Sequence, residues 1–275
     1  MKELILFLHI PRTGGTTFRD IVRRQYKQNE ILEIKHFDNA IGTIKNIPEE
    51  KIQLLKIVIG HFPFGIHQYF PQTCKYITLL RHPISRVIST YNYALSNQNH
   101  PHHKEVRKMS ITDYIKSEVN IFVDNGQLRI ISGVSHSYEN PLFGKCDVEL
   151  VHKAKLNIDK YFLLVGISEK YNQTLLLLKN ILGWELPFYS IANISKNKLN
   201  NSNQKYLTEI KNINRLDIEF YEEINRDFAN KINTFPNFNK ELKSFERKNK
   251  IIGNLMVYQR FKRLLYRNIK SVLYR

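Results

Sequence analysis

Residues 3–26, ELILFLHIPRTGGTTFRDIVRRQY, decide the fold of this 275-residue chain. An apolar run over residues 4–10 breaks at Pro11 into a short polar loop with two glycines, and helix-compatible sequence begins at Thr16 or Thr17. The backbone N–H groups of such a loop and of the first helical turn converge where a phosphate can bind. The stretch therefore predicts a buried strand, an anion-binding loop and a helix, with a phosphorylated nucleotide as the ligand.

The side chains of the loop suit this ligand. Arg12 adds positive charge, and Gly14 and Gly15 let the backbone approach a phosphate closely. Further donors come from three hydroxyl groups, those of Thr13, Thr16 and Thr17. The Walker A pattern is absent, because no glycine precedes Pro11 in the required place and no lysine follows Gly15. The pattern G-x-G-x-x-G is absent too, so ordinary ATP or GTP hydrolases and dinucleotide-binding enzymes are disfavoured.

Composition favours a folded protein with a polyanionic partner. The chain is 42% hydrophobic and carries a formal net charge of +17, which suits a nucleotide, an acidic glycan, an anionic membrane or nucleic acid. Its two cysteines, Cys74 and Cys146, exclude a disulfide framework and a cysteine-rich metal site. Because no apolar run has the length of a membrane span and the N-terminus lacks the features of a signal peptide, we expect a soluble, cytoplasmic chain.

Apolar runs of strand length alternate with helical patterns along the chain. Strands are expected at four places, residues 4–10, 56–60, 76–80 and 161–166, and helices at residues 18–26, 85–95, 171–182 and 206–232. The strands are nearly continuous in apolar residues, as parallel strands covered on both faces are. The pattern predicts an α/β fold with a mostly parallel central sheet flanked by helices. Two polar stretches, residues 96–109 and 193–204, are expected to be loops.

The C-terminal part differs in character from the rest. Lysines and arginines crowd residues 236–275, interleaved with apolar residues at the spacing of an amphipathic helix. We therefore divide the chain into a domain over residues 1–235 and a basic tail over residues 236–275. The tail either packs on the domain with a solvated cationic face or contacts a membrane or an acidic partner.

A second group of candidate ligand-binding residues lies in YITLLRHPISRVISTYNY, residues 76–93. Arg81 follows a buried strand at its carboxyl end, where open α/β sheets bind their ligands. Ser85 and Ser89 are four residues apart and share one side of the expected helix. Arg81 and Ser89 form a candidate second phosphate clamp, a guanidinium fork with a hydroxyl donor. A surface ion pair and solvent-facing serines are the alternative.

HIPRTGGTTF (residues 9–18) and LRHPISRVIS (residues 80–89) resemble the 5′-phosphosulfate and 3′-phosphate segments of glycan O-sulfotransferases of the heparan sulfate 2-O/6-O type, which use 3′-phosphoadenylyl sulfate (PAPS). VIGHFPFGIHQYF (residues 58–70) resembles the segment with the catalytic histidine, and residues 153–183 resemble a late strand–helix unit. The four stretches occur in the same order as in that family. The resemblance spans residues 4–232 and implies a P-loop-like sulfotransferase fold over residues 1–235.

The resemblance assigns roles to named residues. His61 would be the general base, and neutral imidazole suits that role because its ordinary pKa is about 6.5. Arg12 would be the cation of the loop where the family usually has lysine, stabilising charge on the leaving group. The cofactor contacts implied are Arg12, Thr13, Gly14, Gly15, Thr16, Thr17, Arg81, Ser89 and Lys198. A strand-end histidine bonded to a backbone carbonyl is the alternative for His61.

Other assignments are secondary. His67 and Tyr69 are candidates to line the acceptor cleft, and Gln127 and Arg129 match a stretch that would face the cofactor or the acceptor. Ile59 stands where the uronyl 2-O-sulfotransferases have a second histidine, which favours a single base. No spacing of histidine, cysteine or carboxylate residues supports a metal site, and sulfuryl transfer needs none.

These inferences together predict an enzyme that transfers a sulfuryl group from PAPS to a carbohydrate hydroxyl, with His61 as general base. The acceptor would be a polysaccharide, an oligosaccharide or a glycolipid, and nucleic acid is not expected as a partner. The enzyme would be cytoplasmic, with peripheral membrane contact through the basic tail. A Mg²⁺-dependent nucleotide or small-molecule kinase of related fold, and a basic membrane-binding or nucleic-acid-binding protein, are the alternatives.

Overall fold

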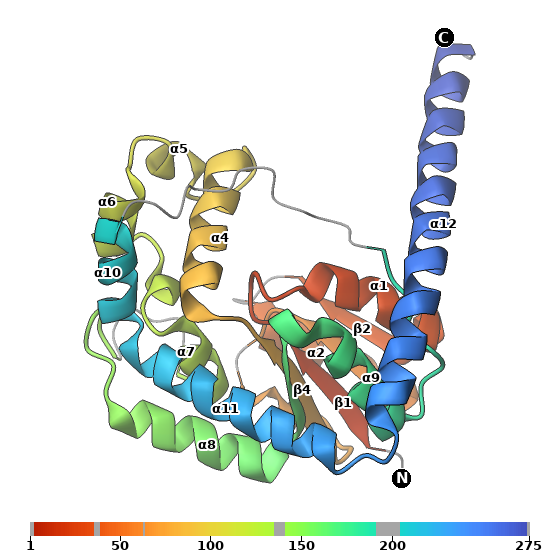
Figure 1. Cartoon of the computed structure of the whole chain (residues 1–275), viewed down its shortest axis with the longest axis horizontal. Coiled ribbons are helices and arrows are strands. Elements are labelled where there is room, and N and C mark those ends of the chain that lie inside the picture. The colour runs from red at the N-terminus through yellow and green to blue at the C-terminus, as the bar shows by residue number, and fades with distance from the viewer. Residues whose placement is uncertain (1–2, 36–38, 63, 135–140, 191–203, 274–275) are drawn as a thin grey trace.

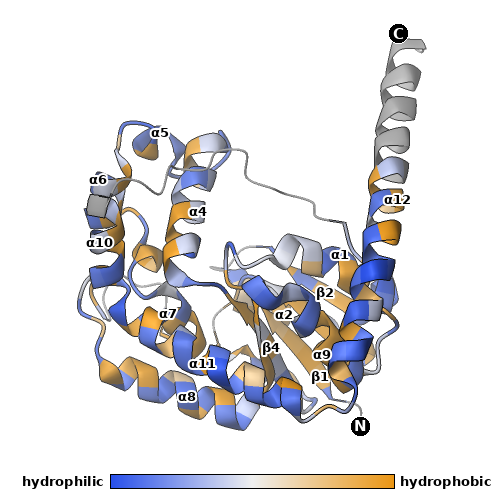
Figure 2. Cartoon of the chain, in the orientation of Figure 1, coloured by the Kyte–Doolittle hydropathy of each residue, from blue (hydrophilic) through white to orange (hydrophobic). Residues whose placement is uncertain are grey.

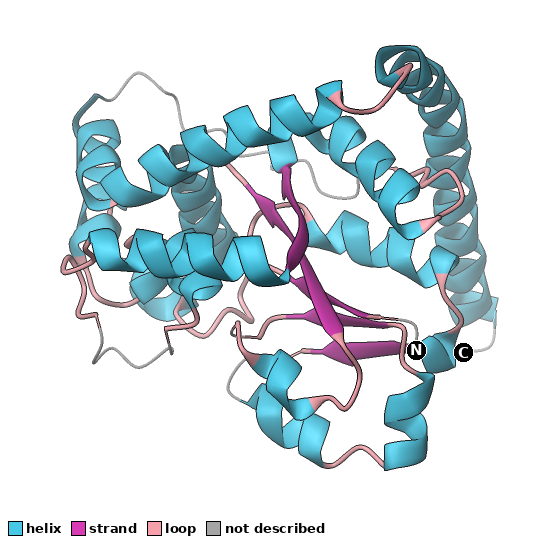
Figure 3. Ribbon diagram, turned by 90° about the horizontal axis from the view of Figure 1, so that it is seen from below, coloured by secondary structure: helices cyan, strands magenta, loops and turns pink. Residues whose placement is uncertain are grey.

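The computed structural model describes residues 3–35, 39–62, 64–134, 141–190 and 204–273. Its centre is a five-stranded parallel sheet in the order β2-β3-β1-β4-β5, with helices on both faces (Figure 1 and Figure 3). The strands are β1 (Leu4–Leu8), β2 (Ile31–Ile34), β3 (Ile57–Gly60), β4 (Cys74–Leu80) and β5 (Phe162–Ile167). The predicted α/β fold with a parallel sheet is confirmed.

Strand β1 lies at the middle of the sheet, and all five of its residues are buried. Leu6 pairs with Val58 on one side and with Tyr76 on the other. A strand covered on both faces needs apolar side chains at every position, which explains the unbroken run LILFL. Because β3 and β4 flank β1, the loop after β1 lies between two neighbouring strand ends, where open α/β sheets bind ligands.

Strand β2 was missed from the sequence, which predicted four strands. It has four residues, Ile31–Ile34, and lies at the edge of the sheet, where it pairs only with β3 among the described strands. Its two middle residues, Leu32 and Glu33, are only partly buried. An edge strand this short does not produce the long apolar run by which the other four were found.

The main helices follow the strands as expected. The predicted helices correspond to α1 (Gly15–Gln25), α4 (Pro83–Ser96) and α9 (Tyr171–Leu182), and α8 (Val148–Tyr161) precedes β5. The expected single helix over residues 206–232 is two helices, α10 (Gln204–Ile213) and α11 (Arg215–Asn233), with a break at Asn214. Shorter helices complete the fold: α2 (Ala40–Lys45), α3 (Glu49–Leu54), α5 (His103–Val106), α6 (Ile111–Lys116) and α7 (Gly126–Ser132). Helix α5 lies in the stretch expected to be a loop, and residues 193–203 of the second expected loop are outside the described residues.

The basic tail forms the long helix α12 (Phe238–Leu273), whose far end projects away from the body (Figure 1). Its first half packs on the domain, because Phe238 and Phe245 are buried and Phe245 stacks on Phe188. Ile251 and Leu255 fall on a different face of the helix and are exposed. Polar and apolar residues both occur along the coloured part of this helix (Figure 2). Most of the side chains for which the amphipathic pattern was predicted lie beyond Tyr258, outside the described side chains, so the amphipathic tail stays a prediction. Among the described residues, no helix has both the length and the apolar character needed to span a membrane.

Candidate functional site

A cavity of about 960 Å³ lies beside the residues that follow β1, β3 and β4. The loop after β1 and the start of α1 contribute Arg12 and residues 14–17, the end of β3 contributes His61, and the end of β4 contributes Arg81. The structure thus brings together, around one cavity, three segments that are far apart in the sequence. His9, directly after β1, also lines the cavity, and lining residues from elsewhere in the chain include Lys35, Arg86, Thr90, Tyr93, His100, Phe122, Tyr171 and Tyr189.

Side chains from other segments lie within hydrogen-bonding distance of the carbonyl oxygens of the loop after β1. The Arg81 Nη1 donates to the Arg12 carbonyl oxygen at 3.0 Å, and the Ser168 Oγ donates to that of Thr13 at 2.6 Å. The Tyr171 hydroxyl lies 3.4 Å from the carbonyl oxygen of Gly14. Because the protein already engages these acceptors, the backbone groups left to meet a ligand are N–H donors, as an anion site requires.

The first turn of α1 supplies further donors. The first helical hydrogen bond runs from the Phe18 N–H to the Gly14 carbonyl oxygen at 3.2 Å, so the N–H groups of residues 15–17 precede it. Gly14 adopts a left-handed conformation with φ of 98°. A Cβ on Gly15 would lie 1.9 Å from the His9 ring, so glycine lets that imidazole lie against the loop.

The Thr13 side chain does not serve as a donor to the cavity. It is 1% exposed, and its hydroxyl donates to the Ile10 carbonyl oxygen at 2.8 Å. The prediction that this hydroxyl adds a ligand contact is therefore wrong for the observed geometry. The bond instead closes the loop on itself, which helps to hold the backbone that follows. Thr16 and Thr17 do line the cavity.

Arg12 and Arg81 line the cavity, and the predicted ligand residue Ser89 is buried behind Arg12 and is not a lining residue. The Arg12 Nε donates to the Ser89 Oγ at 3.1 Å, and the Arg12 guanidinium lies 4.5 Å from the centre of the Tyr93 ring. Burial and the nearby Arg81 charge lower the pKa of Arg12. Within the described part of the chain, neither arginine forms a salt bridge with a carboxylate. The Glu169 carboxylate acts on Arg81 only at longer range. Two half-buried cations without a salt bridge among the described residues form a site that a polyanion would neutralise.

The hydrogen bond of His61 determines its tautomer. The His61 Nδ1 lies 2.9 Å from the His9 carbonyl oxygen, and a carbonyl only accepts hydrogen bonds, so Nδ1 carries the proton. The Nε2 atom is therefore the one with a free lone pair. Burial lowers the pKa of His61 and keeps the ring neutral near pH 7, although the carbonyl bond opposes this shift. The bond to a backbone carbonyl, which the alternative assignment predicted, is present and leaves a ring nitrogen able to accept a proton.

His9 is a site residue that the sequence did not reveal. Its ring stacks on that of His61 with 4.3 Å between centroids and an interplanar angle of 26°. Burial, followed by the neighbouring His61, lowers the pKa of His9 well below its usual value. His9 belongs to the loop quoted at the outset, but the sequence alone did not show that β1 and β3 are neighbours, which brings the two rings together.

The assignments of Gln127 and Arg129 to ligand contact are wrong. Both side chains are buried, at 0% and 2% exposure, and neither lines the cavity. Arg129 forms a buried ion pair with Asp124 and donates to the carbonyl oxygens of Asp124 and Pro141. Their polar groups are satisfied within the protein, so they belong to its interior framework.

The remaining candidates lie away from the cavity or outside the described residues. The His67 Nδ1 lies 3.0 Å from the Tyr76 hydroxyl, and neither His67 nor Tyr69 is a lining residue. Lys198 falls in a segment that the structure does not describe. Among the described residues, no group of three or more histidine, cysteine or carboxylate side chains has the geometry of a metal site.

The chain is similar to known sulfotransferases. A crystal structure of the mouse sulfotransferase SULT7A1 complexed with PAP matches 78% of this chain and 64% of its own length, with 14% identity and a TM-score of 0.41. A protein-tyrosine sulfotransferase of Arabidopsis thaliana is 33% identical over 97 residues, which are 34% of this chain and only 18% of the plant protein.

A family model matches most of the chain. The model described as galactose-3-O-sulfotransferase matches residues 2–256, which include β1 to β5 and the first half of α12. The expected relation to sulfotransferases is thereby confirmed, and the match does not favour the heparan sulfate 2-O/6-O group that the motifs resembled. The chain belongs to the galactose-3-O-sulfotransferase family.

Proposed function

We propose that this protein transfers a sulfuryl group from PAPS to a hydroxyl of a carbohydrate. One observation carries the proposal: a single cavity is lined by a histidine with a free Nε2, a loop of backbone N–H donors, and two arginines without salt bridges to carboxylates among the described residues. A base and a polyanion site around one cavity are what in-line transfer from an anionic donor requires.

Each of these residues would have its own role in the reaction. The His61 Nε2 takes the proton of the acceptor hydroxyl while the hydroxyl oxygen bonds to sulfur. The bond between sulfur and the oxygen of the 5′-phosphate breaks, and that oxygen leaves with the electron pair as part of 3′,5′-ADP. Arg12 and the N–H groups of residues 14–17 stabilise the charge that develops on the leaving oxygen. Arg81 and Ser89 hold the 3′-phosphate.

The carbohydrate acceptor is supported by the family to which the chain belongs, whose description names galactose. The cavity also exposes polar aromatic side chains, Tyr93, Tyr171 and Tyr189, beside the loop. Such groups combine apolar contact with a few directed hydrogen bonds, the usual chemistry of small-molecule sites. A screen of neutral and acidic oligosaccharides with labelled PAPS tests this part, and sulfation of a tyrosine peptide alone would contradict it.

Replacing the proposed base tests the mechanism. His61→Ala should lower kcat about 100-fold or more, because general-base catalysis contributes that much, and should leave the Kd for 3′,5′-ADP unchanged. His67→Ala is the matched control, since this histidine also has a pKa lowered by burial but lies away from the cavity. Full activity of the His61 variant would exclude the proposed role.

Nucleotide selectivity tests the cofactor. The wild-type protein should bind 3′,5′-ADP at least about tenfold more tightly than ADP, because charge-assisted contacts to a phosphate contribute about 1.5–3 kcal/mol. Arg81→Ala should remove most of this difference. Phosphoryl transfer from Mg²⁺-ATP, without preference for 3′,5′-ADP, would favour the kinase alternative and overturn the proposal.

We also propose that the enzyme is cytoplasmic and that α12 contacts an anionic membrane surface. Exposed apolar residues, Ile251, Leu255 and Tyr258, lie at helical spacing on α12, and Lys248 and Lys250 precede them. Such a segment combines apolar burial with attraction to anionic lipids. Ile251→Ser with Leu255→Ser should abolish co-sedimentation with phosphatidylserine vesicles, whereas Leu156→Ser, an exposed control on α8, should not.

A further inference from the structure

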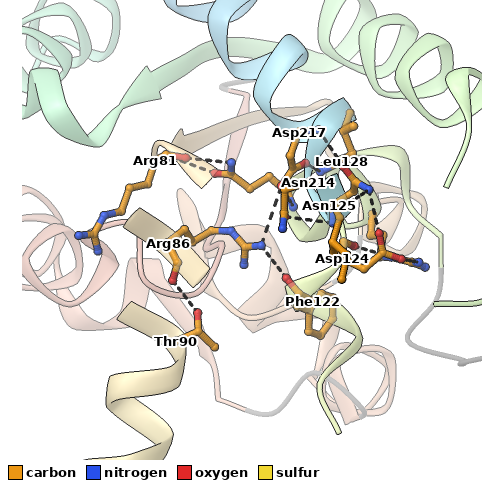
Figure 4. Close-up of polar contacts among 12 residues, drawn as sticks. Arg81, Arg86, Thr90, Phe122, Asp124, Asn125, Leu128, Asn214 and Asp217 are labelled. Atoms are coloured by element: carbon orange, nitrogen blue, oxygen red, sulfur yellow. Dashed lines mark hydrogen bonds and ion pairs between the residues drawn. The ribbon is translucent and has the colours of Figure 1, made fainter. Parts of the chain in front are cut away.

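A buried polar network behind the cavity holds the backbone of Arg81 (Figure 4). The Gln127 Oε1 accepts a hydrogen bond from the Arg81 N–H at 2.9 Å, and the Gln127 Nε2 donates to the Arg81 carbonyl oxygen at 2.9 Å. One side-chain amide thus pairs with both backbone groups of the residue that follows β4, as a neighbouring strand would. The pairing determines where the Arg81 side chain enters the cavity.

Gln127 is held in turn by a carboxylate from a distant helix. Asp217 of α11 is fully buried, and its two oxygens accept hydrogen bonds from the N–H groups of Gln127 at 3.1 Å and Leu128 at 2.9 Å. The connection is reciprocal, because the Asp217 N–H donates to the Asn125 Oδ1 at 2.9 Å. The first turn of α7 and the first turn of α11 are therefore linked by hydrogen bonds in both directions.

The same carboxylate also orients α4. The Nη2 of Arg86 lies 3.9 Å from the Asp217 Oδ2, and both side chains are almost completely buried. Gly126 leaves the space that this guanidinium needs, since a Cβ there would lie 2.8 Å from the Arg86 Nη2. Helix α4 also carries Ser89. Asp217 is thus connected to both members of the proposed 3′-phosphate clamp. It reaches Arg81 through Gln127, and it reaches Ser89 through α4.

We infer that Gln127 and Asp217 are positioning residues for the 3′-phosphate of the nucleotide, although neither lines the cavity. The inference rests on the proposed function and adds residues to it. A residue that acts only through Arg81 should change affinity for nucleotides with a 3′-phosphate and leave other nucleotides unaffected. A residue that only stabilises the fold should change both affinities alike.

The test compares Gln127→Met with Ser132→Ala. Methionine keeps the approximate volume and removes both bonds to Arg81, whereas Ser132→Ala removes a buried hydrogen bond elsewhere in α7. Isothermal titration would measure the Kd for 3′,5′-ADP and for 5′-AMP at 25 °C. We expect Gln127→Met to weaken 3′,5′-ADP about tenfold, as expected for two lost hydrogen bonds, and 5′-AMP less than about twofold. Ser132→Ala should change neither value.

A double-mutant cycle decides whether the effect passes through Arg81. In an Arg81→Ala background, Gln127→Met should have no further effect on 3′,5′-ADP. Gln127→Leu, which also removes both hydrogen bonds and introduces no charge, should show the same selective loss and serves if the methionine variant does not fold.

Several outcomes would overturn the inference. The first is an equal loss of affinity for 3′,5′-ADP and 5′-AMP in Gln127→Met, and the second is no loss of affinity for either nucleotide. The third is that the losses of binding free energy from Gln127→Met and Arg81→Ala add up in the double variant. If the wild-type protein itself does not prefer 3′,5′-ADP to 5′-AMP, the proposed function fails and the inference fails with it. A wild-type preference that Gln127→Met leaves intact overturns the inference alone.

Discussion

Single residues of the site adopt backbone conformations that most side chains avoid. Arg12 has φ of 70°, a left-handed conformation that costs a non-glycine residue about 1–2 kcal/mol. Its guanidinium nevertheless has two partners, the Ser89 hydroxyl and the Tyr93 ring. The fold thus accepts a backbone cost to present a cation at the loop, a pattern found at functional sites.

Two substitutions separate the backbone cost from the charge of Arg12. Arg12→Gly should raise the free energy of unfolding by up to about 1 kcal/mol, because glycine tolerates this φ, and should lower kcat about 100-fold or more by removing the charge. Arg12→Lys should keep the charge and lower kcat only about tenfold, since lysine lacks the planar fork. Urea denaturation and steady-state kinetics measure both effects, and an active glycine variant would contradict the role.

Gly60, immediately before His61, cannot accept a side chain. Its φ is 151°, and a Cβ would lie 2.0 Å from the Ile34 carbonyl oxygen, a backbone atom of β2. Gly60→Ala should therefore lower the free energy of unfolding by about 3 kcal/mol or more, in the range of severe steric substitutions. Gly183→Ala is the control, because its φ is also positive but nothing lies within 4 Å of the added carbon, so only about 1 kcal/mol should be lost. Equal losses would show that the contact with β2 is not the cause.

At the scale of elements, the connection between β5 and α9 stabilises the loop after β1. Ser168→Ala would remove the hydrogen bond to the Thr13 carbonyl oxygen and should raise the KM for PAPS by about threefold to tenfold, the effect of one hydrogen bond. The KM for the acceptor should not change. Ser117→Ala removes a similar bond to the Tyr114 carbonyl oxygen away from the cavity and should leave both constants unchanged.

The strands that could be predicted from the sequence are those that are covered on both faces, because burial requires apolar residues at nearly every position. β1, β3, β4 and β5 were predicted because strands covered on both faces are apolar throughout, whereas the edge strand β2 was not. The residues of the site also differ in how well the sequence predicts them. Arg12, His61 and Arg81 stand at strand ends and were predicted. The hydrogen bonds of the Gln127 side chain to Arg81 were not, because they depend on Asp217, which is 90 residues away in the sequence. No pattern among neighbouring residues in the sequence indicates such a contact.

Over the whole molecule, two partly buried neutral histidines, His9 and His61, couple stability to pH. Burial lowers the pKa of His9 and of His61 below the ordinary value of 6.5. The unfolded chain then binds more protons than the folded protein as the pH falls through about 6.5, so stability decreases on acidification, by at most about 1.4 kcal/mol per pH unit for each histidine. The loss continues until the pH reaches the lowered pKa values of the folded state.

This coupling predicts a measurable pH profile. The free energy of unfolding from urea titrations should be nearly constant from pH 8 to 7 and should fall between pH 6.5 and 5. His9→Phe should reduce the slope, because it removes one of the two groups and keeps a ring stacked on His61. An unchanged slope in this variant would show that His9 does not contribute. The kcat should likewise fall on acidification only below about pH 6.5, when His61 becomes protonated.

The order of the strands along the chain has a consequence for biosynthesis. The loop after β1 leaves the ribosome before the residues whose side chains fix its carbonyl groups, which are Arg81, Ser168 and Tyr171. Domains generally fold as units during synthesis, and pairings between distant segments form slowly. A nascent chain that ends before β5 would therefore contain the whole loop but lack Ser168 and Tyr171, which fix it. Under the proposed function, retention on immobilised 3′,5′-ADP should begin only after Tyr171 has been translated.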